Sequence, residues 1–465
     1  MKISKLTIKN FKIFSPDDEF VIDDLNVPDG VNEGTGLNVF VGENGSGKTS
    51  LLEAIALPLL EYKAENFSIE NFNDFEEKVE INIFSKDNFT VDGTMPRSSF
   101  EAKGFSFEAG VRARDSKNYL SSIIVSDQKF IKSDPSKPKD GSPDLRSAVN
   151  NPFKGKRFNE NDVLFLDKNR LFQTRSGNFN TTRFDRLMED FSYQYLKNNE
   201  ITDLNEELGK KIRKEVENDF LDQAVSKFRE ICDHEVRLDF LDNLKPFKES
   251  FFSIKKDNEQ QILINNLGSG YEMIFCLLYS FYLAKQTGKE LIILIDEPEL
   301  HLHPALQEKF IQFLIEFSKE AQIFITSHSP LVVKQVLLNE KVKVRMLKNG
   351  SEVLDIGNRL LSYLSANEIN YLAFDLPTEE YHNELFEELK IKDDGARATP
   401  LNLKDFDIYF FQTSKGEPAN YPYNGASNQV SIHTHLRTQI HHRGTAGQPN
   451  ITDIKKSIET MRTFF

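Results

Sequence analysis

Uninterrupted apolar runs that end in polar residues recur along the chain. They lie within residues 37–41, 163–173, 291–297 and 322–330. Short apolar runs without alternation are typical of strands that a parallel sheet buries on both faces. The pattern therefore predicts an α/β fold built around a parallel or mixed sheet.

Alternating apolar and polar positions mark a second group of strands. Residues 3–8 and 20–22 alternate early in the chain, and residues 78–93 and 105–126 alternate further along. Period-two alternation is typical of antiparallel strands with one buried face. We therefore expect an antiparallel N-terminal subdomain, while residues 251–267 predict a separate hairpin.

Helical spacing of apolar residues appears at 50–60, 267–288 and 304–320. A further stretch, 184–240, has the same spacing together with many charged residues. The charged stretch is long enough for a helical hairpin that forms a lid, and far too short for a long coiled coil. Residues 360–465 have weaker patterns and predict a separate, mostly helical C-terminal region.

The first apolar run leads into a glycine-rich segment, Gly42–Thr49, with the spacing G-x-x-x-x-G-K-T. A strand, this loop and a helix in succession predict a phosphate-binding site. Gly45 and Gly47 let backbone N–H groups point at a phosphate, and Lys48 reaches the β- and γ-phosphates. We expect a nucleoside triphosphate with Mg²⁺ on the Thr49 hydroxyl. The candidate nucleotide contacts are Gly42, Asn44, Gly45, Ser46, Gly47, Lys48, Thr49 and Ser50.

Two acidic residues, Asp296 and Glu297, end the third apolar run. An aspartate delivered by a strand beside a phosphate loop is the expected second Mg²⁺ ligand. Glu297 is then placed to orient and deprotonate the attacking water. His328 ends the following strand, where its imidazole can hydrogen-bond the γ-phosphate. These three residues are the candidate catalytic and metal-binding groups.

Other histidines and the cysteines do not predict a second metal centre. His301 and His303 invite a metal site with Glu299, but no third ligand cluster accompanies them, and we favour a loop that packs against a second subunit. Cys232 and Cys276 lack the C-x-x-C spacing of zinc sites.

Charge and hydropathy narrow the class of protein. The chain has 72 Asp and Glu against 58 Lys and Arg, which gives a net charge of −14. Any nucleic-acid contact must therefore come from local patches or from a partner. No apolar run is as long as the roughly 18 residues of a membrane-spanning helix, and the N-terminus lacks the apolar core of a signal peptide. We expect a soluble, cytoplasmic protein with no membrane contact.

These motifs, in this order, resemble the head of ABC-type ATPases. The segments that carry the resemblance are GENGSGKT, LGSGYE, LIILIDEPELHLHP and ITSHSP. More narrowly, they are similar to bacterial stand-alone ATPases related to the overcoming-lysogenisation-defect and recombination ATPases. The resemblance implies ATP as the nucleotide and hydrolysis to ADP and phosphate as the reaction.

In that group, a serine of the signature loop contacts the γ-phosphate bound to a second subunit. Carried onto this sequence, Ser269 and Gly270 take this part, although Gly268 stands where the usual L-S-G-G-Q has its serine. The resemblance also implies a glutamine-bearing loop between the lobes, with Gln173 as candidate and Gln128 as the alternative. One chain is then an incomplete enzyme, so we expect at least a homodimer.

The C-terminal region resembles that of ATPases from bacterial anti-phage operons, through residues 369–390 and 433–443. It is similar to the ATPase of Septu-type systems, whose partner is a small HNH endonuclease. It is also similar to the ATPase of the PARIS system, which cages a separate nuclease. The resemblance implies a scaffold that binds ATP and restrains a nuclease until infection, with nucleic acid contacted through that partner.

Two other interpretations stay open. A DNA-repair or recombination ATPase is the competing class. Arg437 and His442, with four residues between them, match the arginine–histidine motif of HEPN ribonucleases, which cleave RNA by acid–base chemistry. His433, His435 and His441 share the predicted helix, so a buried polar cluster or a partner-binding surface explains this stretch equally well.

The patterns and the resemblance together divide the chain into four segments. We expect an ATPase lobe with the phosphate loop and the antiparallel subdomain at 1–183, and a helical lid at 184–250. A second ATPase lobe, with the signature, the acidic strand end and His328, follows at 251–350. The helical C-terminal region at 351–465 would then dock a partner.

Overall fold

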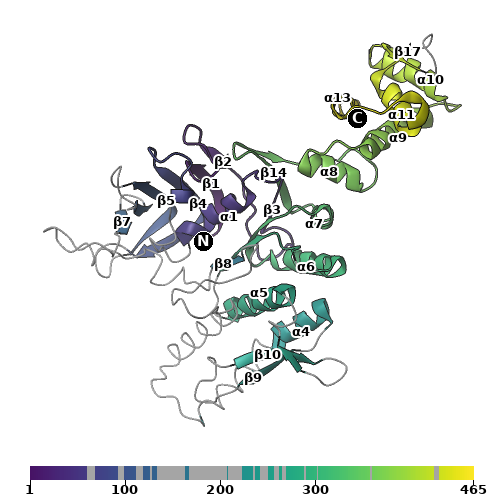
Figure 1. The fold of residues 1–465 in the computed structure, drawn as a ribbon. Helices are drawn as coiled ribbons and strands as arrows, with labels where there is room; N and C mark the ends of the chain where they lie inside the picture. Colours follow the sequence, from purple (N-terminus) through teal and green to yellow (C-terminus); the bar gives the residue numbers. More distant parts are fainter. Residues whose placement is uncertain are drawn as a thin grey trace. The chain divides into compact units, whose positions relative to one another are not determined.

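The computed structural model describes residues 1–59, 69–92, 99–111, 119–125, 128–132, 163–166, 207, 222–233, 236–240, 250–255, 261–263, 269–286, 290–300, 302–356, 359–423 and 429–465. They form two compact units, Met1–Val353 and Leu354–Phe465, and each unit is described by itself (Figure 1).

A six-stranded sheet in the order β15-β14-β3-β13-β12-β8 carries the phosphate loop. Its strands are β3 (Leu37–Val41), β8 (Val163–Leu166), β12 (Ile292–Asp296), β13 (Gln322–Thr326), β14 (Lys343–Lys348) and β15 (Glu352–Asp355). The pairings from β14 to β8 are all parallel. Every residue of β3, β12 and β13 is buried, which confirms the strands predicted from the apolar runs.

The register of this sheet determines which side chains can meet. Asp296 pairs with Thr326, and Thr326 pairs in turn with Phe40. Because parallel strands run in one direction, the carboxyl ends of β12, β13 and β3 lie side by side. Ligand sites in parallel sheets form at this edge.

The predicted antiparallel subdomain is confirmed as a second six-stranded sheet, in the order β2-β1-β4-β5-β6-β7. Its strands are β1 (Ile3–Lys9), β2 (Phe20–Ile22), β4 (Val79–Asp92), β5 (Ser99–Val111), β6 (Tyr119–Val125) and β7 (Gln128–Lys132). All of its neighbouring strands pair antiparallel. In β4, Val79, Ile81 and Ile83 are buried at alternate positions, as the period-two pattern predicts.

Helix α1 (Lys48–Leu59) joins the two sheets into one core (Figure 1). Leu51 and Ile55 of the helix are fully buried in the same cluster as Leu6 and Ile81 of the antiparallel sheet. Phe324 of β13 belongs to this cluster as well. The helix that begins at Lys48 is therefore held against both sheets, which fixes the end of the phosphate loop.

The middle of the chain departs in part from the prediction. Helix α4 (Asp222–Cys232) lies in the segment expected to be helical, but Val236–Phe240 is a strand, β9. It pairs antiparallel with β10 (Ser250–Lys255), which in turn pairs with β11 (Gln261–Leu263) in the predicted hairpin. The helical structure expected over 184–240 is thus wrong at its C-terminal end, because residues 236–240 complete a three-stranded sheet.

Helix α5 (Ser269–Gln286) is a core helix, as predicted. Phe275 packs edge-on against Phe228 of α4, with ring centres 5.5 Å apart, and Tyr279 is fully buried. Within the described residues, no helix combines the length and the hydropathy that crossing a bilayer requires.

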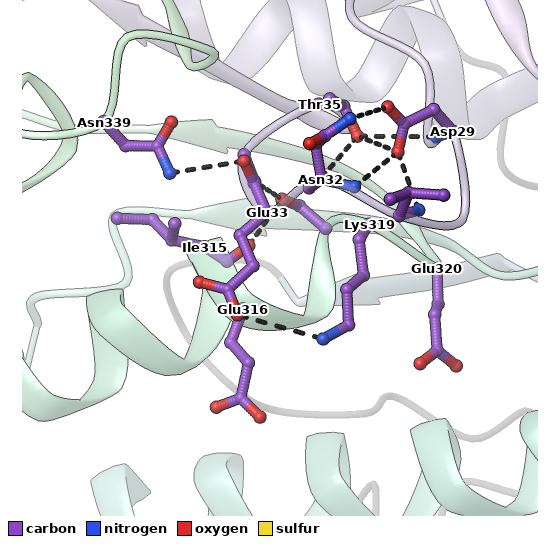
Figure 2. Close-up of polar contacts among 12 residues, drawn as sticks. Asp29, Asn32, Glu33, Thr35, Ile315, Glu316, Lys319, Glu320 and Asn339 are labelled. Carbon is purple, nitrogen blue, oxygen red and sulfur yellow. Dashed lines mark hydrogen bonds and ion pairs between the residues drawn. The ribbon is translucent and has the colours of Figure 1, made fainter.

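The loop that precedes β3 holds the end of helix α6 (Pro304–Phe317) (Figure 2). Asp29 shapes this loop by accepting hydrogen bonds from the backbone N–H groups of Val31 and Asn32, each at 2.8 Å. The N–H of Gly34 donates to the carbonyl oxygen of Ile315 at 3.0 Å, and that of Gly30 donates to Lys319 at 2.8 Å. Carbonyl groups at a helix end lack partners within the helix, and this loop supplies them.

The second unit is mostly helical, as predicted. Its described α-helices are α8 (Ala366–Phe374), α9 (Glu379–Gly395), α10 (Leu403–Phe406), α11 (Ile432–His441), α12 (Arg443–Ala446) and α13 (Ile451–Arg462). A π-helical segment, Asp407–Ser414, follows α10. Their apolar faces meet in one core around Tyr381, Phe386, Phe411 and Ile458.

Candidate functional site

The loop between β3 and α1 needs glycine at three positions. Gly42, Gly45 and Gly47 have φ angles of 141°, 78° and 104°, which residues with a Cβ rarely adopt. At Gly42 a Cβ would also lie 2.5 Å from the carbonyl oxygen of Leu347 in β14. The loop therefore has the tight backbone that its glycine spacing predicts.

Lys48 folds back onto this loop. Its Nζ donates to the carbonyl oxygens of Gly42 at 3.0 Å and Glu43 at 2.8 Å, and to Ser46 Oγ at 3.3 Å. Only 5% of the residue is exposed. Burial lowers the pKa of Lys48 to about 8, although neighbouring carboxylates oppose that change. A bound phosphate would offer this ammonium group a full negative charge in place of neutral carbonyl oxygens.

Thr49 and Asp296 meet directly, although they lie far apart in the sequence. Thr49 Oγ1 donates to Asp296 Oδ2 at 2.9 Å, and Thr326 Oγ1 donates to Asp296 Oδ1 at 2.5 Å. Asp296 is 1% exposed. A hydroxyl beside a carboxylate is the kind of oxygen donor set that suits Mg²⁺, which usually keeps waters as its other ligands. The residues present therefore fit the predicted metal.

Glu297 and His328 face one another across the ends of β12 and β13. His328 Nε2 lies 3.9 Å from Glu297 Oε1. The backbone of Glu297 has a φ of 50°, and its N–H donates to the carbonyl oxygen of Thr326 at 3.2 Å. Burial, and next the charge of Lys48, lower the pKa of His328. This shift favours the neutral imidazole, in which one nitrogen donates and the other accepts.

Residues 37–334 contain all of these side chains, and they match the family described as "AAA domain, putative AbiEii toxin, Type IV TA system". The match extends over more than half of the chain. The chain belongs to this family. Together with the phosphate loop, membership of this AAA family makes the protein a P-loop ATPase that binds ATP.

Relatives of this family member match it over different lengths. "Retron Vc95 probable ATPase" of Vibrio cholerae serotype O1 biovar El Tor is 24% identical over an alignment of 361 residues, gaps included. The match covers 66% of this chain and 68% of that protein. "Septu protein PtuA" of Bacillus thuringiensis is 31% identical over an alignment of 105 residues, which covers 20% of this chain and 26% of that protein. "OLD nuclease" of Thermus scotoductus is 23% identical over an alignment of 344 residues, which covers 71% of this chain and 59% of that protein. The chain therefore spans less than two thirds of the last two proteins.

A solved structure of a Smc head bound to the C-winged helix domain of ScpA also matches. The match covers 77% of this chain and 98% of the Smc-head chain, with a TM-score of 0.45 and 15% sequence identity.

The remaining predicted ATP contacts are placed as follows. Asn44 is exposed, Ser46 is buried and Ser50 is half-buried. Ser269 is the first residue of α5, and Gly270 beside it is buried. Both positions lie at the N-terminus of α5.

The structure describes only some of the residues predicted for the glutamine-bearing loop and for a histidine metal site. Gln173 and His301 lie outside the described residues, and Gln128 begins β7 at one edge of the antiparallel sheet. His303 is the N-cap of α6, where its Nδ1 accepts from the N–H of Ala305 at 3.4 Å. The described parts of the chain hold no cluster of three or more histidine, cysteine or acidic residues suited to a metal.

Sequence reasoning missed Thr326 and Ser327. Thr326 bonds both to Asp296 and to the backbone of Glu297. Ser327 Oγ donates to Glu299 Oε1 at 2.8 Å. Hydroxyl residues are common at strand ends, so only the register of β12 against β13 reveals which carboxylates they reach.

Arg437 and His442 lie at α11 in the second unit. Arg437 Nε donates to Glu387 Oε1 at 3.0 Å, and its guanidinium group lies 5.2 Å from the ring centre of Phe386. His442 is the C-cap of α11 and is exposed, as is His441. The ion pair and the ring contact give Arg437 a structural role on this surface.

The other histidines of α11 differ from one another in environment. His433 is fully buried, and its Nδ1 lies 2.6 Å from Ser457 Oγ. His382, also fully buried, reaches the same hydroxyl through Nε2 at 2.9 Å. Burial lowers the pKa of each imidazole to about 3. His435 is partly exposed to solvent, and its Nδ1 lies 2.9 Å from the carbonyl oxygen of Pro422.

Proposed function

We propose that this chain is the ATP-hydrolysing scaffold subunit of a bacterial anti-phage defence complex, in which it regulates a partner nuclease. Hydrolysis would be slow and would serve as a signal. The names of two relatives, "Retron Vc95 probable ATPase" and "Septu protein PtuA", support this class of system. An HNH-type nuclease is the favoured partner, docked on the helical C-terminal region at 351–465.

The observation that carries the ATPase proposal is the contact between Thr49 and Asp296. Their oxygens lie 2.9 Å apart, so the phosphate loop and the acidic strand end form a single site. Thr49 and Asp296 would hold Mg²⁺, which when bound neutralises charge on the β- and γ-phosphates. Lys48 would bind the same phosphates as a positive point charge.

Glu297 and His328 would act on the reacting groups. Glu297 orients the water in line with the bond to the leaving group and takes its proton as the new P–O bond forms. His328 donates a hydrogen bond from its imidazole to the γ-phosphate. ATP and water give ADP and phosphate, with the bond between the γ-phosphorus and the bridging oxygen broken.

Oligomerisation is part of this proposal. Ser269 and Gly270 at the start of α5 would contact the γ-phosphate bound to a second copy, so that two heads enclose the nucleotide. The N-terminus of an 18-residue helix favours negative charge, which supports such a contact.

The test is purification of the chain from cells that carry its gene with the natural genomic neighbours, with and without ATP. We expect an oligomer of this chain with a small nuclease in fixed stoichiometry, as measured by native mass spectrometry. A chain that purifies alone and hydrolyses ATP faster when DNA is added, with steep salt dependence, would instead indicate the DNA-repair class.

A further inference from the structure

Glu299 joins the two loops that follow β12 and β13. Its Oε1 accepts from Ser327 Oγ at 2.8 Å and from the backbone N–H of His328 at 2.9 Å. Its own carbonyl oxygen accepts from the N–H of Leu302 at 3.2 Å and from Gln307 Nε2 at 3.1 Å. One carboxylate oxygen therefore holds the loop that carries His328, while helix α6 and the turn before it hold Glu299.

These hydrogen bonds continue into the next helix. Ser327 Oγ accepts from the N–H of Ser329 at 2.9 Å, and Ser329 is the N-cap of α7 (Pro330–Val336). The backbone on both sides of His328 is thus fixed by side-chain contacts. An imidazole on this backbone keeps its place 3.9 Å from Glu297.

The second carboxylate oxygen of Glu299 is unusual. Glu299 Oε2 is buried and has no hydrogen-bond partner among the described residues. Burial, with a smaller contribution from the charge of Glu297, raises the pKa of Glu299. A buried carboxyl group with an unpaired oxygen costs stability, and such groups call for a functional explanation.

We propose that Glu299 is a positioning residue for ATP hydrolysis, which fixes His328 against Glu297 through Oε1 without touching the nucleotide. The inference rests on the proposed ATPase function. Its hydrogen bonds go to the backbone and to a serine, so a group with an acceptor oxygen at the same place would serve as well.

The test compares Glu299→Ala with Glu299→Gln in the full chain. A misplacement of about 1 Å at a reacting group costs roughly a hundredfold in rate, so we expect Glu299→Ala to lower kcat between tenfold and a hundredfold. ATP affinity should stay within about twofold of the native value, because Lys48 and the phosphate loop are untouched. Glu299→Gln keeps the acceptor oxygen and should stay within about threefold of native kcat.

A second measurement reads the position of His328 without ATP. In the histidine-labelled full chain, the imidazole NMR signal assigned with His328→Ala should shift and broaden in Glu299→Ala but not in Glu299→Gln. Glu308→Ala, at an exposed position of α6, is the matched control and should change neither kcat nor the signal.

The outcomes separate the two proposals. A native chain that hydrolyses ATP no faster than Lys48→Ala overturns the ATPase proposal, while the NMR comparison still decides the role of Glu299. Native kcat and an unchanged His328 signal in Glu299→Ala overturn the positioning role. Equal losses in Glu299→Ala and Glu299→Gln overturn the acceptor role, because the charge and not the oxygen would then matter.

Discussion

At Glu297 the chain leaves its strand in the left-handed region of backbone space, with a φ of 50°. This conformation costs a residue other than glycine about 1–2 kcal/mol. The two hydrogen bonds from its N–H to the backbone and the hydroxyl of Thr326 hold the bend in place. Strain of this kind concentrates at functional sites, which supports Glu297 as the residue that activates water.

Replacing that carboxylate tests its role directly. We expect Glu297→Gln to bind ATP with native affinity and to lose at least about a hundredfold in kcat, because an amide cannot accept the proton of the attacking water. The variant should also accumulate as a closed, ATP-bound assembly in size-exclusion chromatography. Hydrolysis at the native rate would remove Glu297 from the mechanism.

Lys48→Ala should abolish measurable ATP binding in isothermal titration calorimetry. The substitution removes the buried ammonium group that neutralises the phosphates and leaves the carbonyl oxygens of Gly42 and Glu43 without their donor. Lys334→Ala, at an exposed position of α7, is the control and should bind as the native chain does. Unchanged binding by Lys48→Ala would contradict the assignment of the site.

Among the elements, the segment between α6 and β13 packs its backbone closely against Gly36, directly before β3. A Cβ at Gly36 would lie 2.2 Å from the carbonyl oxygen of Ser318 and 2.5 Å from that of Ala321. Neither carbonyl group can move without disturbing the end of α6 or the start of β13. Glycine at this position is therefore required by space.

We expect Gly36→Ala to lower the free energy of unfolding of the first unit by about 1–3 kcal/mol, the usual cost of overpacking. Thermal unfolding followed by circular dichroism measures the change. Gly395→Ala, where a Cβ would meet no atom within 4 Å, should leave the transition temperature nearly unchanged. Equal stability of Gly36→Ala and the native chain would show that the loop is not packed as described.

Sequence patterns predicted most of these elements, because burial of one or both faces of a helix or strand produces a regular spacing of apolar residues. One strand that the sequence did not predict, β9, contains the alternation Val236, Leu238 and Phe240, but this short pattern follows a long charged helical stretch that dominates a wide window. A strand of only five residues is stabilised mainly by pairing with its partner, here β10. Such pairing between separate segments leaves no pattern in the local sequence.

The residues of the candidate site also differ in whether the sequence could predict them. The phosphate loop and the acids after β12 could be predicted, because each is set by the strand that precedes it in the sequence. The links made by Thr326, Ser327 and Glu299 could not, because they depend on the register between β12 and β13.

In the molecule as a whole, the second unit carries its own dependence on pH. His382 and His433 have pKa values of about 3 in the fold, against about 6.5 in an unfolded chain. Below pH 6.5 the unfolded state binds more protons than the folded state, so stability falls as the pH falls, by up to about 1.4 kcal/mol per pH unit for each histidine. Above pH 6.5 the contribution is constant.

Hydrogen exchange of α11 and α13, corrected for intrinsic rates, measures this effect between pH 7.5 and 5. We expect protection in both helices to fall across that range, whereas protection in β3 of the first unit should change less. His435→Gln is the control and should retain the fall in protection, because the substitution leaves both buried imidazoles, His382 and His433, in place. Constant protection in α11 would contradict the burial of these two imidazoles.

The position of β3 in its sheet also has a consequence for the protein during synthesis. Its neighbours, β13 and β14, are translated much later, and the N–H of Gly350 completes the phosphate loop by donating to the carbonyl oxygen of Ser46 at 3.0 Å. At ordinary ribosomal speeds this delay is on the order of tens of seconds. A nascent chain therefore carries an unfinished nucleotide pocket until nearly all of the first unit, which ends at Val353, has emerged from the ribosome.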